Sequence, residues 1–66
     1  MPIYGYEKIL SEIKVNTTVQ HYKFPGNGIV KRVDTETYSI PMATVLFPLL
    51  GNGEKVYRPL NEFQKI

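Results

Sequence analysis

The hydrophobic pattern near the N-terminus has the period of a helix. Tyr6, Ile9, Leu10 and Ile13 fall at positions i, i+3, i+4 and i+7, and polar residues fill the positions between them. This spacing predicts one short helix. So short a helix is marginal alone, because nucleation is costly, so it must pack on the rest of the chain. A strand from Ile3 to Tyr6 is the alternative.

From Val15 onward the pattern changes to short runs of β-branched and aromatic residues separated by turn residues. The expected strands are Thr17–Phe24, Ile29–Val33, Met42–Phe47, Glu54–Arg58 and a closing strand over Gln64–Ile66. A polar loop joins the second strand to the third. Asn52-Gly53 is a strong turn signal, so the third and fourth strands should form a hairpin. Pro59 ends the fourth strand or places it at a sheet edge, because proline cannot donate to a ladder.

Short strands with strong turn signals, in a chain of 66 residues, predict a mainly all-β domain whose bent sheet closes as a small five-stranded barrel. Residues 1–14 form an extension that carries the helix, and residues 15–66 form the barrel. In the second strand, alternation places Ile29, Lys31 and Val33 on one face. The expected core is Val19, Ile29, Val33, Val45, Phe47, Val56 and Leu60, with Leu10 and Ile13 joining it if the helix covers one end of the barrel.

Composition narrows the classes of function. The chain has no cysteine, so it forms no disulfide and no thiolate metal site. Its net charge of +2 is far from the dense positive charge of a dedicated nucleic-acid binder. The longest apolar stretch, Ala43–Leu50, is interrupted by Thr44 and Pro48 and is too short to span a bilayer, and the N-terminus lacks a signal-peptide pattern. We therefore expect a cytoplasmic protein that does not bind membranes.

Side chains suited to catalysis are few. Ser11, Ser39, His21 and Asp34 are the residues from which a catalytic triad could be assembled, and neither serine lies in a Gly-x-Ser-x-Gly motif. His21 is expected to be partly buried and hydrogen-bonded to backbone. Asp34 and Glu36 are interpreted as a solvated pair in a loop. The sequence thus predicts no enzyme, no catalytic residue, no metal ligand and no cofactor.

Binding residues are better represented, because aromatic side chains stand beside cations in the C-terminal half. Phe47 and Phe63 are interpreted as structural, whereas Tyr22 and Tyr57 carry hydroxyl groups that favour water. The candidate partner-binding residues are Lys55, Tyr57 and Arg58 beside an edge strand, Lys31 and Arg32 as steering charges, and Tyr22. An edge strand binds a partner by pairing with a strand of that partner.

Residues 15–66 also resemble a known family. The runs Gly26-Asn27-Gly28-Ile29-Val30, Ala43-Thr44-Val45-Leu46-Phe47 and Lys55-Val56-Tyr57-Arg58-Pro59-Leu60 resemble the Tudor-like RNA-polymerase-interaction domain shared by CarD-type regulators and transcription-repair coupling factors. The span from His21 to Val30 is similar to the start of the C-terminal Tudor-like module of UvrD/PcrA-type helicases. The resemblance implies an SH3/Tudor-like barrel that docks on bacterial RNA polymerase.

Together these features predict a non-catalytic protein-interaction module, a transcription-linked adaptor or regulator from a bacterium, phage or plasmid, with RNA polymerase as the favoured protein partner. One alternative is a nucleic-acid-binding module of SH3 or OB type in which Tyr22 and Tyr57 stack on bases. A second is a small oligomeric enzyme like one plasmid-borne SH3-like reductase family. The Val-Gln-Ile-Tyr run of that family is replaced here by Lys55-Val56-Tyr57-Arg58. The oligomeric state is left open.

Overall fold

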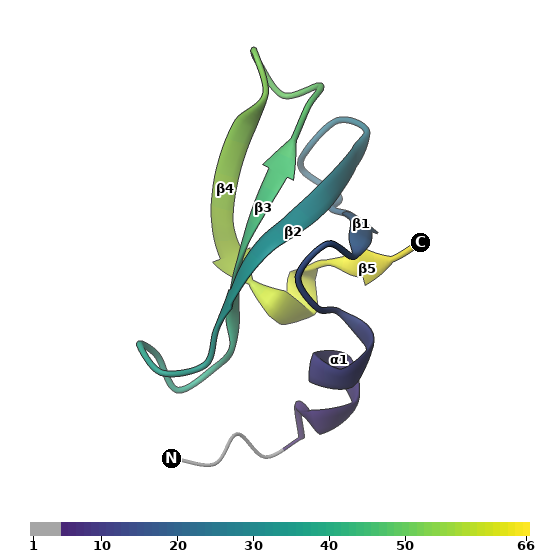
Figure 1. Ribbon diagram of the computed structural model, residues 1–66. Helices are drawn as coiled ribbons and strands as arrows, with labels where there is room; N and C mark the ends of the chain where they lie inside the picture. The colour runs from purple at the N-terminus through teal and green to yellow at the C-terminus, as the bar shows by residue number, and fades with distance from the viewer. Residues whose placement is uncertain (1–4) are drawn as a thin grey trace.

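The computed structural model describes residues 5–66, which form one helix, five strands and a short 3₁₀ turn (Figure 1). In chain order these are α1 (Glu7–Glu12), β1 (Thr18–Gln20), β2 (Asn27–Asp34), β3 (Met42–Phe47), β4 (Glu54–Pro59), η1 (Leu60–Glu62) and β5 (Gln64–Lys65). The mainly β architecture and the short N-terminal helix are confirmed. The alternative strand from Ile3 to Tyr6 falls largely outside the described residues.

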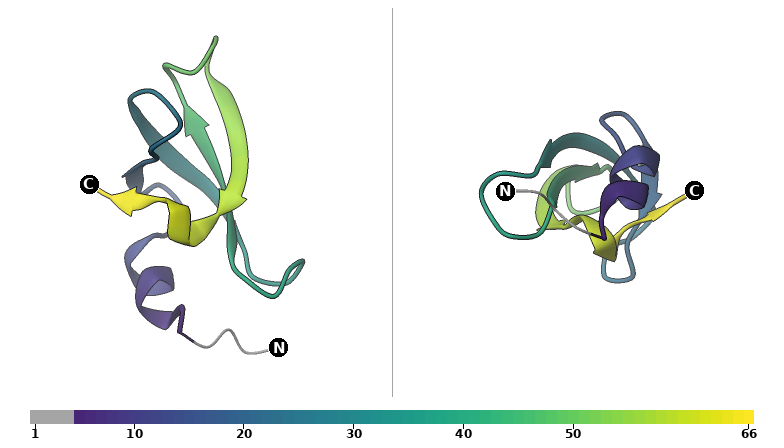
Figure 2. Two further views of the ribbon diagram at one scale, coloured as in Figure 1. Left: turned by 180° about the vertical axis from the view of Figure 1, so that it is seen from behind. Right: turned by 90° about the horizontal axis from the view of Figure 1, so that it is seen from below.

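The five strands form one antiparallel sheet in the order β4-β3-β2-β1-β5. The predicted β3–β4 hairpin is confirmed. Seen from below, the sheet bends around its interior, and α1 lies at that end (Figure 2). Within residues 5–66 no ladder joins β4 to β5, so the sheet is open rather than closed as expected. The chain leaves β4 at Pro59, turns through η1, and then pairs with β1 instead.

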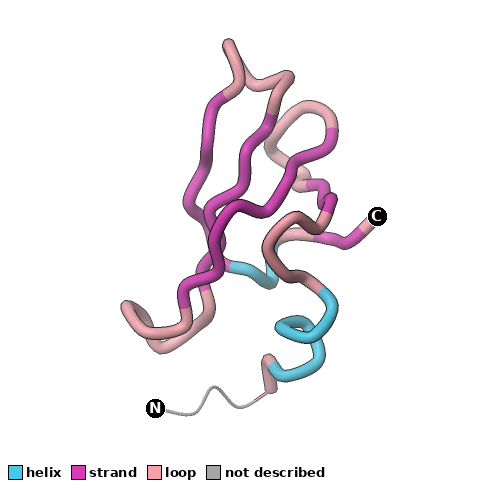
Figure 3. The backbone as a smooth tube through the Cα atoms, in the orientation of Figure 1, coloured by secondary structure: helices cyan, strands magenta, loops and turns pink. Residues whose placement is uncertain are grey.

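The first strand is much shorter than predicted. It ends at Gln20, and the chain then forms a loop over residues 21–26 before β2 begins at Asn27 (Figure 3). His21 explains the early end, because its Nδ1 accepts the N–H of Lys23 at 3.0 Å and its carbonyl accepts the N–H of Phe24. These local bonds close a turn at residues for which the sequence predicts a continuing strand.

β2 contains a bulge that the alternating pattern did not predict. Val30 pairs with Val45, but Arg32 pairs with Thr44, so Lys31 is the extra residue. The bulge lets Val30 and Val33 both face the core, although they are three residues apart. The predicted grouping of Ile29, Lys31 and Val33 on one face is therefore wrong.

The core is one cluster of hydrophobic side chains from α1, the strands, η1 and the segments next to them. Its buried members are Ile13, Val19, Val30, Ala43, Val45, Phe47, Leu60 and Phe63, and Ile9, Leu10, Phe24, Val33, Leu50 and Val56 pack partly buried against them. This confirms most of the predicted core and the structural role of Phe47 and Phe63. Ile29 is the exception, because it lies half-buried opposite Leu46 on the outer face of the sheet.

Gly28 is buried where β2 crosses the ring of Phe47. A Cβ atom at this position would lie 2.8 Å from Cζ of Phe47 and 2.5 Å from Cγ1 of Val45, so only glycine lets the strand approach this closely.

No helix among residues 5–66 has the length and apolar character needed to cross a membrane.

Candidate functional site

β4 is an edge strand, and its side chains alternate between two faces. Val56 lies opposite Val45 and Arg58 opposite Ala43, both buried partners, so Val56 and Arg58 point to the inner face. Lys55 and Tyr57 consequently point to the outer face. The three β4 residues predicted to act together share one edge, as expected, but Arg58 faces away from the other two.

A single hydrogen bond shows which backbone N–H and C=O groups of β4 point away from β3. The N–H of Leu60 donates to the carbonyl of Pro41 at 2.9 Å, in register with the β3–β4 ladder. Because such bonds recur at every second residue, the N–H and C=O groups of Lys55 and Tyr57 point away from β3. Pro59 has the same parity, so its missing N–H leaves no gap in the ladder. The edge therefore presents two consecutive outward positions to a partner.

The outer face beside this edge is apolar at its centre and carries Lys55, Arg32 and the Asp34 carboxylate around it. Ile29 and Leu46 are half-buried there, and Lys55 follows them in the same row. Arg32 lies two strands from Tyr57 in the next row, with Thr44 between them, and Arg32 and Lys55 are both exposed. Of the two predicted steering cations, Arg32 therefore lies on the same face as Lys55 and Tyr57. Lys31 is exposed at the bulge.

Tyr57 is held in a fixed position on that face. Its hydroxyl donates to Oδ2 of Asp34 at 2.8 Å, and Asp34 also accepts bonds from the Thr37 hydroxyl and from the N–H groups of Glu36 and Thr37. The Thr37 hydroxyl, with these other donors, holds the pKa of Asp34 well below its usual range, and the bond to Asp34 raises the pKa of Tyr57. The ring of Tyr57, although 43% exposed, is therefore ordered before any partner arrives.

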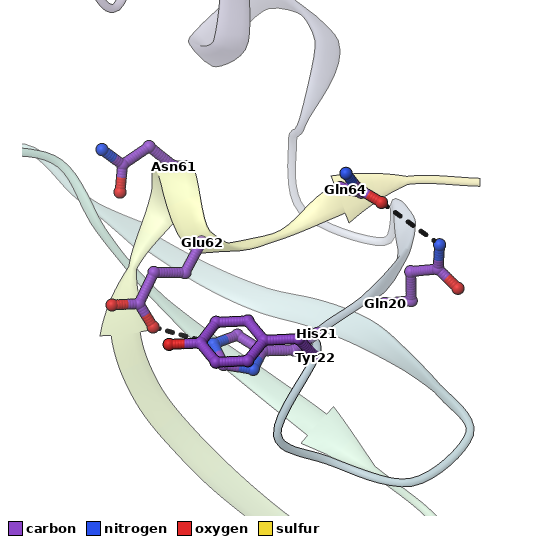
Figure 4. Close-up of a pocket in the computed structure, with 6 residues that line it drawn as sticks. All are labelled: Gln20, His21, Tyr22, Asn61, Glu62 and Gln64. Carbon is purple, nitrogen blue, oxygen red and sulfur yellow. Dashed lines mark hydrogen bonds and ion pairs between the residues drawn. The ribbon is translucent and has the colours of Figure 1, made fainter.

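A polar groove lies on a different part of the molecule. It has a volume of about 570 Å³ and is lined by Gln20, His21, Tyr22, Asn61, Glu62 and Gln64 (Figure 4). These residues come from the end of β1, the following turn, η1 and β5. Pairing of β1 with β5 brings the two segments together, since Gln20 is opposite Gln64 in that ladder.

A hydrogen-bonded clamp forms one wall of the groove. His21 is 5% exposed, and its Nδ1 accepts a backbone N–H, so Nε2 carries the ring proton and donates to Oε1 of Glu62 at 2.8 Å. Arg58 donates through Nε to Oε1 and through Nη2 to Oε2 of the same carboxylate, each at 3.0 Å. The expected backbone bond of His21 is confirmed, and Glu62 is a partner that the sequence prediction missed.

This clamp holds three segments of the chain together. The Glu62 carboxylate receives three donors, and the Arg58 guanidinium, followed by His21, lowers its pKa below the usual value. Ser11 bonds to the carbonyl of Lys8 within the α1 segment. Among residues 5–66, no three His, Asp or Glu side chains gather as metal ligands. The clamp joins the turn after β1 to the end of β4 and to η1.

The clamp predicts an acid-dependent difference between the wild type and Glu62→Gln. Because the folded pKa of Glu62 lies below the unfolded value of 4.5, its carboxylate stabilises the fold fully above that pH, and this contribution is lost as the pH falls through the folded pKa. We expect the wild type to have the higher urea midpoint at pH 7 and the advantage to shrink at about pH 3. An equal advantage at both pH values would contradict the clamp.

The six predicted binding residues therefore divide into two groups. Lys55, Tyr57 and Arg32 share the outer face, with Lys31 at the adjoining bulge, whereas Tyr22 lines the groove and Arg58 bonds to its Glu62. Tyr22 and Tyr57, proposed as a pair of base-stacking residues, are not brought together. In comparisons with protein-family models, curated proteins and solved structures, none matches this chain.

Proposed function

We propose that this chain is a non-catalytic protein-interaction module of SH3/Tudor-like architecture that docks on cytoplasmic RNA polymerase by adding a strand to β4. The proposal rests on the position of β4 at the edge of the sheet. There the backbone groups of Lys55 and Tyr57 point away from β3. RNA polymerase is the partner implied by the resemblance of residues 15–66 to RNA-polymerase-interaction domains.

The strand order and the turn between the last two strands support the SH3/Tudor-like part of the proposal. Five antiparallel strands bend around one core, and η1 separates β4 from β5. This arrangement leaves β4 as the longer exposed edge, because β5 has only two residues. A long edge strand is the natural template for a partner strand.

Main-chain hydrogen bonds would supply affinity, and alternating side chains would supply specificity. A strand paired with β4 meets Lys55 and Tyr57 on the outer face and Val56 and Arg58 on the inner face. Tyr57 is already fixed by Asp34, so ordering its ring costs little on binding. Lys55 and Arg32 favour a partner segment that carries carboxylates on the outer face.

Binding of the purified chain to purified bacterial RNA polymerase tests this function. We expect the wild type to bind and Lys55→Glu to bind about tenfold more weakly, because the substitution reverses the charge beside the edge. Lys65→Glu is the matched control, since Lys65 is an exposed cation on the opposite edge strand, β5. Failure of the wild type to bind would refute the partner, and equal losses in both variants would refute the β4 edge as the site.

A further inference from the structure

Tyr22 forms an exposed aromatic platform in the groove. The side chain is 75% exposed, and its ring stacks on His21 with a centroid distance of 4.5 Å and an interplanar angle of 18° (Figure 4). Both ring nitrogens of His21 are hydrogen-bonded, so the ring beneath the platform cannot turn freely. The fold thus fixes the plane on which a second flat ring could stack.

Three amide side chains line the same groove as this platform. Gln20 donates through Nε2 to Oε1 of Gln64 at 3.3 Å. This bond leaves Oε1 of Gln20 as an acceptor and Nε2 of Gln64 as a donor, and Asn61 adds a further amide to the lining. The edge of a nucleobase likewise presents hydrogen-bond donors and acceptors side by side.

A cation lies over the same ring. Nζ of Lys23 lies 5.7 Å from the centroid of the Tyr22 ring. A ring stacked on Tyr22 would displace the flexible ammonium group, which could then pair with a phosphate attached to the ligand. The lining contains no aliphatic side chain, whereas an amphipathic peptide helix binds through a hydrophobic groove. The groove therefore suits a flat polar ring that carries a phosphate better than it suits a peptide.

We propose that this groove binds one base of a single-stranded nucleic acid. Tyr22 stacks on the base, the amides of Gln20, Gln64 and Asn61 bond to its edge, and Lys23 contacts a neighbouring phosphate. The inference does not depend on docking to RNA polymerase, because Lys55 and Tyr57 lie on the outer face and do not line the groove. With one phosphate contacted, log K should fall with log[salt] with a slope of about −0.7.

Fluorescence anisotropy with short labelled single strands, one of DNA and one of RNA, tests the site at low salt. We expect the wild type to bind, Tyr22→Phe to bind within about twofold of it, and Tyr22→Ala to lose about tenfold or more, because the stacking plane is removed. Tyr38→Ala is the matched control, since Tyr38 is also an exposed tyrosine but does not line the groove. The two strands show whether the 2′-hydroxyl contributes.

Three outcomes would overturn this assignment. One is the absence of wild-type binding to either strand at low salt. Another is an equal loss of binding in Tyr22→Ala and Tyr38→Ala. The third comes from amide NMR titrations, in which an extended neutral peptide shifts the signals of Asn61 and Gln64 while neither oligonucleotide does so. That result would assign the groove to a peptide.

Discussion

Phe47→Ala is expected to remove most of the stability of this protein. Phe47 is fully buried, and its ring packs against Phe24 at a centroid distance of 5.2 Å and against Phe63 at 6.3 Å. Truncating a buried phenylalanine to alanine costs about 3–5 kcal/mol. At roughly 0.05–0.15 kcal/mol per residue, the whole chain is stable by only about 3–10 kcal/mol. The single substitution therefore removes a large part of the free energy of unfolding.

Urea unfolding followed by circular dichroism measures this effect. We expect Phe47→Ala to be largely unfolded, or to unfold at a much lower urea concentration than the wild type. Val15→Ala is the control for shortening a hydrophobic side chain, since Val15 is 53% exposed and its loss should change stability by about 0.5 kcal/mol or less. If both variants unfolded at the wild-type midpoint, the core described for β3 would be incorrect.

Lys55→Pro is expected to abolish docking on RNA polymerase while the fold is retained. Proline removes the N–H of residue 55, which points away from β3, so the β3–β4 ladder keeps its bonds. Pro59 already occupies a position of the same parity in this strand. A partner strand would lose a main-chain bond in the middle of its contact, and we expect affinity to fall by about tenfold or more.

Two variants separate the backbone effect from other causes. Lys55→Ala removes the charge but keeps the N–H, so it should bind more tightly than Lys55→Pro. Val56→Pro places proline at a residue whose N–H points toward β3, so it should lower the urea midpoint of unfolding. Lys55→Pro should change that midpoint far less. Equal binding of Lys55→Ala and Lys55→Pro would contradict strand addition.

Much of the fold could be predicted from local patterns, because strands, turns and the helix leave a period in the sequence. The β3–β4 hairpin and the helix ending near Ile13 were visible in this way. The bulge at Lys31 was not, since one extra residue resets the alternation without any change of residue type. The early end of β1 comes from a turn that His21 closes with Lys23 and Phe24, and the ring of His21 is held in place by Glu62, which is 41 residues away.

The two candidate sites also differ in how far the sequence indicates them. Pro59 pointed to an edge strand, and strict alternation from Val56 would also have shown that Arg58 faces inward. The groove carries no such signal, because it exists only after β1 and β5 pair. The i,i+4 spacing of Arg58 and Glu62 is the one local hint of the clamp.

Docking by strand addition requires the outward amides of β4 to become hydrogen-bonded to a partner strand. Amide hydrogen exchange at Lys55 and Tyr57, with and without bound RNA polymerase, measures this most directly. We expect both amides to exchange quickly in the free chain and to become strongly protected in the complex. A complex that forms while both amides still exchange at the free rate would show that docking takes place elsewhere.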